Sequence, residues 1–179
     1  MTARPPIYGL MAEFETPDAL RDAAERARAT GYRRMDAYSP FPVEGLAEAI
    51  GFRDPWIPRL VLLAGLFGAA FGFASQYWVT VLDYPLNVGG RPLNSWPAYI
   101  PITFELTILF AALTAVVGMI ALNRLPMPYH PVFNVPAFRR VTDDGFFLCI
   151  EATDPRFDRG ETKRFLERLG AREVTEVEH

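Results

Sequence analysis

Hydrophobic and polar positions are segregated along this chain. No charged residue occurs from Leu60 to Leu82, and none occurs from Leu106 to Asn123. Each apolar run approaches or exceeds the roughly 20 residues that a helix needs to cross a hydrocarbon core of about 30 Å. The pattern predicts two transmembrane helices, over residues 59–82 and 98–123. The alternative for the first run is a buried helix of a soluble protein, but buried helices of this length usually carry some polar residues.

Aromatic residues mark the edges of both runs, as is typical of a membrane interface. Trp56 and Trp78 flank the first run, and Trp96 and Tyr99 precede the core of the second. The connecting segment, residues 83–97, is short and contains Gly-Gly, Pro and Asn, which favour turns. The two spans are therefore expected to form a helical hairpin.

Basic residues near the span ends predict the orientation of the hairpin. The connecting loop contains only Arg91, whereas the outer flanks contain Arg53, Arg59, Arg124, Arg139 and Arg140. This bias favours both termini in the cytoplasm and a periplasmic loop. No removable signal peptide is expected, because acidic residues follow closely behind the short apolar patch at the N-terminus.

Small residues recur at helical spacing in both predicted spans. They are Gly65, Gly68, Ala69, Gly72 and Ser75 in the first, and Ala111, Ala115 and Gly118 in the second. Small side chains let helices approach closely in lipid, so these stripes predict packing against the other span or a partner subunit. The alternative is that Gly and Ala are simply common in membrane helices.

The N-terminal end, residues 1–44, has the pattern of a βαβ unit. A strand-like run covers residues 7–14, and a second one covers residues 33–41. The helix between them is expected to begin after Thr16, a typical N-cap residue, and to end before Gly31.

The C-terminal end, residues 143–179, repeats this order with a strand, a helix and a strand. Sliding the two ends over each other at a constant offset aligns Gly31 with Gly170. Two βαβ halves predict an α+β class with a split ferredoxin-like domain, interrupted by the transmembrane hairpin. The alternative is two unrelated small appendages.

Two linkers are expected between this domain and the membrane. The first, residues 45–58, contains a short amphipathic segment at 46–50. The second, residues 124–142, is rich in Pro and aromatic residues. Such a composition resists helix formation, so we expect an extended strap along the membrane surface or a neighbouring protein.

Composition excludes several classes of function. The net charge is -3 without a basic block, which disfavours nucleic-acid binding. The one cysteine, Cys149, allows neither an internal disulfide nor an iron–sulfur cluster. The two histidines are His130 and His179, both outside the spans, so a bis-histidine membrane haem has no candidates. A nucleophilic Ser75 or Cys149 has no sequence-visible base, so the chain is predicted to be non-catalytic by itself.

Glu105 lies within the otherwise apolar second span. A charged carboxylate there is costly and is expected to face protein or a water-filled cavity. Two functional hypotheses follow: an intramembrane proton-handling group, or a partner to a cation on another subunit. The structural alternative is an interfacial carboxylate bonded within the hairpin or to water among the headgroups.

Three segments together resemble the D-type membrane protein of bacterial alternative complex III, a quinol–electron acceptor oxidoreductase. They are "SWPAYIPITFELTILFAALTAV" at 95–116, "PYHPVFN" at 128–134 and "DDGFFLCIEA" at 143–152. The resemblance covers nearly the full chain, and "PITFELT", with Glu105, is its most distinctive part.

The resemblance implies a cofactor-free subunit of the bacterial inner membrane with an assembly role. It places haem c and iron–sulfur clusters on partner subunits, and the hairpin beside a large quinol-binding subunit. Two other classes stay open. One is a membrane-anchored accessory or regulatory protein with a ferredoxin-like ligand-binding domain. The other is an enzyme that uses Glu105 as an acid or base.

Overall fold

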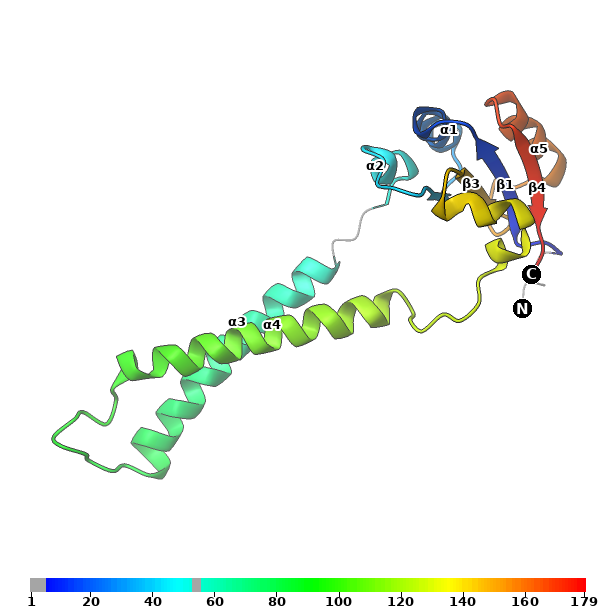
Figure 1. Cartoon of the computed structure of the whole chain (residues 1–179). Helices are drawn as coiled ribbons and strands as arrows, with labels where there is room; N and C mark the ends of the chain where they lie inside the picture. The colour runs from blue at the N-terminus through cyan, green and yellow to red at the C-terminus, as the bar shows by residue number, and fades with distance from the viewer. Residues whose placement is uncertain (1–5, 53–55) are drawn as a thin grey trace. The chain divides into compact units, whose positions relative to one another are not determined.

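The computed structural model describes residues 6–52 and 56–179 (Figure 1). These residues form two compact units. The first unit is built from both ends of the chain, 6–52 and 128–179, and the second from the segment between them, 56–127. Residues 1–5 of the predicted first half, and residues 53–55 of the predicted linker with Arg53, lie outside the described residues.

The first unit combines helices with an antiparallel sheet, which confirms the predicted α+β class. Its described elements, in chain order, are β1 (Gly9–Phe14), α1 (Pro17–Thr30), β2 (Met35–Tyr38), α2 (Leu46–Ile50), the 3-10 helices η3 (Pro131–Asn134) and η4 (Pro136–Thr142), β3 (Phe146–Glu151), α5 (Arg159–Arg168) and β4 (Glu173–Val177). The four strands form one sheet in the order β2-β3-β1-β4. The predicted strands are present but shorter at their ends than the sequence suggests.

Strand pairing joins the two ends of the chain. In β1, Leu10 lies opposite Ile150 of β3 on one side and opposite Glu176 of β4 on the other. The pairing of β2 with β3 joins the two ends again. Every pair of neighbouring strands therefore takes one strand from each end, and neither end can build this sheet alone.

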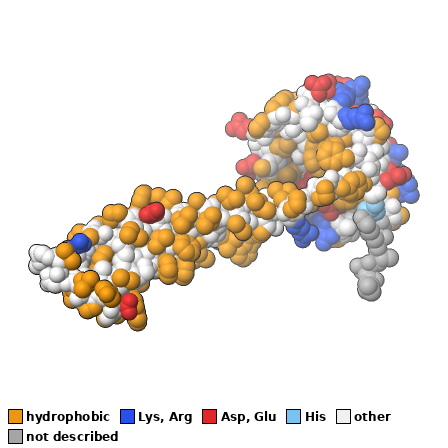
Figure 2. Space-filling view, turned by 60° about the horizontal axis from the view of Figure 1, so that its bottom comes forward, with side chains coloured by type: hydrophobic (Ala, Val, Ile, Leu, Met, Phe, Trp, Pro, Cys, Tyr) orange, Lys and Arg blue, Asp and Glu red, His pale blue; other side chains and the backbone are white. Residues whose placement is uncertain are grey.

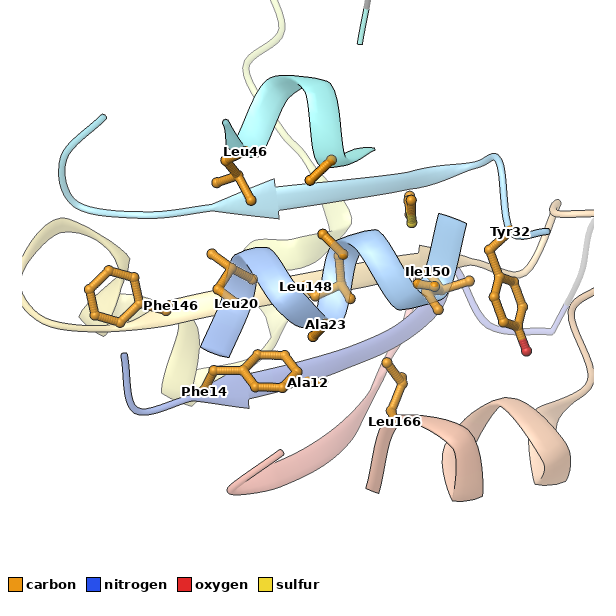
Figure 3. Packing of buried hydrophobic residues seen from close by; sticks show 14 of the residues in the cluster. Ala12, Phe14, Leu20, Ala23, Tyr32, Leu46, Phe146, Leu148, Ile150 and Leu166 are labelled. Carbon is orange, nitrogen blue, oxygen red and sulfur yellow. The ribbon is translucent and has the colours of Figure 1, made fainter. Parts of the chain in front are cut away.

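One face of the sheet is covered by α1 and α5 (Figure 1). The apolar positions of α1 recur every three or four residues, so Leu20, Ala23 and Ala27 share one buried face. They pack on inward-facing strand residues such as Leu148, as Figure 3 shows. The Thr16 hydroxyl caps the helix by accepting the Ala19 N–H at 3.2 Å.

The opposite face of the sheet is covered by η3 and η4, and this overturns the prediction of an extended strap over residues 131–142. Val132, Val135 and Phe138 are buried there. Their spacing of three residues matches the period of a 3-10 helix, which places them on one side. They contact the second face of the sheet through Met11, Phe147, Cys149 and Val177. The strands are apolar on both faces, so this face needed an apolar cover.

A buried ion pair fixes η4 to β1. The Glu13 side chain is 8% exposed and lies 2.6 Å from Arg140 Nη1. Arg140 also contacts the exposed Asp144 at 2.8 Å. These contacts hold the end of the covering segment against the sheet.

Asp154 organises the loop after β3. Its side chain is buried and accepts the backbone N–H groups of Arg33 at 2.6 Å, Arg34 at 2.8 Å and Arg156 at 2.8 Å. Burial pushes the pKa of Asp154 upward, but the three hydrogen bonds outweigh it and the pKa is lowered from its ordinary value. The ionised form therefore stabilises the fold.

Asp154→Asn is expected to reduce the free energy of unfolding by about 1–3 kcal/mol at neutral pH, because an amide offers fewer acceptor sites to these N–H groups. A carboxylate with a lowered pKa contributes above its unfolded pKa of about 3.9 and loses that contribution as the pH falls through its folded value. The gap between the native chain and the variant should therefore shrink below about pH 4. Urea dependence of Cys149 thiol labelling by a dipyridyl disulfide measures it. A gap that is constant with pH would contradict this role.

The second unit is an antiparallel helical hairpin. Its elements are α3 (Trp56–Tyr77), the π-helical η1 (Trp78–Asp83), the 3-10 helix η2 (Trp96–Tyr99) and α4 (Ile100–Leu122). The two long helices lie side by side (Figure 1). Pro101 lies in the first turn of α4, where its missing N–H has no helical partner to lose.

Candidate membrane and subunit interface

The hairpin exposes an apolar surface along both helices. The two stretches Trp56–Asp83 and Trp96–Leu122 are long and apolar enough to cross a membrane. Only 17% of the first apolar window and 0% of the second are buried. Figure 2 shows hydrophobic side chains along the visible face of the hairpin, while charged side chains gather mainly on the other unit. Such a surface fits lipid or an apolar protein partner rather than water.

Three glycines of α3 form the contact with α4. A Cβ atom on Gly68 would lie 2.5 Å from the carbonyl oxygen of Leu106, and one on Gly72 would lie 3.0 Å from the Cα of Thr103. A Cβ on Gly65 would make ordinary contact, 3.7 Å from the Cβ of Ala111. The two backbones therefore approach most closely at Gly68 and Gly72, as small residues permit in membrane helices.

The other small residues of the predicted stripes are less enclosed. Ala69, Ala111, Ala115 and Ser75 are half-buried. The Ser75 hydroxyl donates to the carbonyl of Gly72 at 3.2 Å. A Cβ on Gly118 would meet nothing within 4 Å. A packing role for the full set, within the hairpin or against a partner, stays a prediction.

A polar network near the loop end of the hairpin was missed from the sequence. The Gln76 side-chain amide donates to the carbonyls of Gly72 at 2.9 Å and Tyr99 at 3.0 Å. The Tyr99 hydroxyl donates to the carbonyl of Leu93 at 3.0 Å and is bonded to the Thr80 hydroxyl. The signal was available, because a glutamine in an uncharged span needs a partner. These bonds tie α3 to the start of α4.

Glu105 points away from α3. At about 100° per residue, it lies roughly 160° around the α4 axis from Thr103 and from Thr107, both of which face α3. Its side chain is exposed, and it makes no hydrogen bond or ion pair with the described residues. The interfacial alternative of a bond within the hairpin is therefore not seen in this part of the chain.

The surroundings of Glu105 on α4 are apolar. Pro101, Ile108, Leu109 and Ala112 lie one or two turns away on the same face, and all are exposed. Insertion scales give a cost on the order of 3 kcal/mol for a charged residue at the centre of a membrane helix. This face can lower that cost only by meeting a polar or cationic group.

A separate cluster of titratable groups lies on the second face of the sheet in the first unit. The Tyr8 hydroxyl lies 3.3 Å from His130 Nε2 and 3.4 Å from Glu151 Oε1. Burial, with the nearby charge of Glu151, raises the pKa of Asp36, while His130 opposes the rise. These contacts link the strands to the segment before η3. Within residues 6–52 and 56–179, no group of three or more His, Cys, Asp or Glu side chains is arranged to hold a metal ion.

Comparison with known proteins gives one family. A family model described as "Alternative complex III, ActD subunit" matches residues 8–176 of the 179 residues. None of the curated proteins compared with the chain matches it. The match includes both strand-forming ends, the hairpin and Glu105.

Proposed function

Because the chain belongs to the family of the ActD subunit of alternative complex III, an oxidoreductase complex, we propose that it is a cofactor-free, non-catalytic membrane subunit with an assembly role. Its family makes it a component of a multisubunit electron-transport complex. The observation that carries the assembly role is the exposed apolar surface of the hairpin, of which little is used by the contact between its own helices. A chain with such a surface needs lipid and apolar partner helices around it.

We place the redox chemistry in the partner subunits. Haem c and iron–sulfur clusters are expected there, and the hairpin is expected to pack beside a large quinol-binding membrane subunit. The polar side chains of the hairpin near its loop, Gln76, Thr80 and Tyr99, already bond to one another or to backbone carbonyls. This engagement supports a structural role for them.

The first unit is proposed to be a split ferredoxin-like domain in the cytoplasm of a bacterial cell. Two βαβ halves and the strand order β2-β3-β1-β4 support this arrangement. A hairpin of two spans returns the chain to the side of the membrane from which it entered, so both halves can meet there. The loop between η1 and η2 is then periplasmic.

Purification in a mild detergent, through a tag on this chain, tests the assembly role. The expected result is recovery with iron–sulfur, multihaem cytochrome c and large membrane subunits, together with quinol oxidation. Isolation of a lone ligand-binding protein would instead support the accessory or regulatory alternative. Turnover by the isolated chain would support an enzyme.

Proton handling by Glu105 is a second proposal, motivated by a carboxylate without an internal partner in an apolar helix. Glu105→Gln keeps the shape of the side chain and removes its titration. If Glu105 handles protons, this variant should assemble normally but show reduced quinol oxidation or proton translocation in vesicles. Normal assembly, oxidation and translocation together would end the proposal.

A further inference from the structure

The hairpin satisfies several of its own polar side chains but not Glu105. Ser75 and Thr107 donate to carbonyls one turn earlier, at 3.2 Å and 2.6 Å. Gln76 bonds across to the start of α4. Glu105, in contrast, is exposed and points to the side opposite α3. Its partner must therefore come from outside the hairpin.

We propose that the outer face of α4, formed by Pro101, Glu105, Ile108 and Ala112, is a second interface, covered by a transmembrane helix of another subunit that presents a lysine or arginine at the depth of Glu105. This inference rests on the proposed function and names the partner chemistry of that hairpin. Charge complementarity selects the occupant, because a carboxylate in an apolar setting is stabilised by a cation that donates a hydrogen bond.

The position of Glu105 disfavours lipid as that partner. It lies five residues beyond the start of α4 at Ile100, about 8 Å along the helix axis. Hydrocarbon offers no hydrogen-bond donor at that depth. The phosphate of an anionic headgroup, reached by bending outward, would repel the carboxylate. A second helix meets both needs.

The shape of this face also suits a helix. Ala112 lies two turns from Glu105 on the same side, and its small side chain leaves room for close approach. Ile108 and Leu109 between them are exposed and supply apolar contact area. A helix that crosses here packs against apolar side chains while its basic residue reaches Glu105.

Glu105→Leu distinguishes the partners by the sign of its effect. If Glu105 faces lipid, leucine should leave recovery of the other subunits unchanged or improve it. If it meets a basic side chain, leucine leaves that cation unpaired, and recovery in a mild detergent should fall about tenfold. Ala70→Leu, at an exposed position of α3, is the matched control and should change recovery less than about twofold. Resistance to alkaline extraction shows that both variants insert.

Photo-crosslinking identifies the covering molecule directly. A benzophenone amino acid at Ala112 of the otherwise native complex should form an adduct with an apolar segment of another subunit that contains Lys or Arg. An adduct with lipid alone, or with a second copy of this chain, would overturn the inference, as would unchanged recovery of Glu105→Leu. Failure of the native chain to recover any other subunit would instead refute the proposed function itself.

Discussion

Gly68→Ala should separate α3 from α4. The added Cβ atom would lie 2.5 Å from the Leu106 carbonyl oxygen and 3.1 Å from the Phe110 Cβ. The nearest of these is backbone, which cannot swing away as a side chain can, so the helices must move apart. We expect a loss of about 1–3 kcal/mol in hairpin stability, the usual cost of overpacking. The three tryptophans, Trp56, Trp78 and Trp96, all lie in the hairpin, so their fluorescence during titration with dodecyl sulfate reports its unfolding.

The other glycines of the hairpin provide graded controls. Gly72→Ala should have a smaller effect than Gly68→Ala, because its nearest contact would be 3.0 Å. Gly65→Ala, with a nearest contact of 3.7 Å, and Gly118→Ala, with open space, should be neutral or slightly stabilising. Equal effects at Gly68 and Gly118 would show that the glycines of α3 do not form the contact with α4.

Leu20→Ala should destabilise the first unit by about 2–5 kcal/mol. Leu20 is 0% exposed and projects from α1 onto the sheet (Figure 3). Its removal leaves a cavity between the helix and strands from both ends of the chain, because the core includes Leu148 and Ile150. Cys149, the single cysteine, is 1% exposed, so urea-dependent labelling of its thiol reports the opening of this unit.

Glu25→Ala is the matched control for Leu20→Ala. Glu25 lies on the exposed side of the same helix, and substitutions at such positions usually change stability by no more than about 0.5 kcal/mol. The hairpin should be unaffected in both variants, and tryptophan fluorescence in dodecyl sulfate checks this. If Leu20→Ala and Glu25→Ala label at the same urea concentration, α1 does not cover the sheet as described.

Much of the fold follows from the sequence because its signals are local and strong. Thr16 and Gly31 mark the ends of α1, and Gly31, at φ 110°, adopts the left-handed conformation that favours glycine. Gly170 after α5 has φ 85°, as the alignment of the two ends leads one to expect. The long uncharged runs likewise predict α3 and α4 with small errors at their ends.

The covering segment and the site needed information that is not local. Proline density at 124–142 predicts extended backbone, but Val132, Val135 and Phe138 fold into 3-10 turns because the sheet offers them an apolar face. The network of Gln76 and Tyr99 depends on which residues meet across the hairpin, and the sequence does not show that. For Glu105, the sequence shows the cost of the carboxylate, and the structure adds that it points away from α3.

Labelling with a membrane-impermeant maleimide tests most directly whether the hairpin crosses the membrane and returns. Cys149→Ser provides a thiol-free background, and single cysteines at Asn94 of the loop and Glu44 of the first unit, both exposed, are the probes. In intact cells with a permeable outer membrane, Asn94→Cys should react, while Glu44→Cys should react only after the inner membrane is disrupted. Reaction of both cysteines in intact cells, or of neither before disruption, would contradict a hairpin that spans the membrane with both chain ends in the cytoplasm.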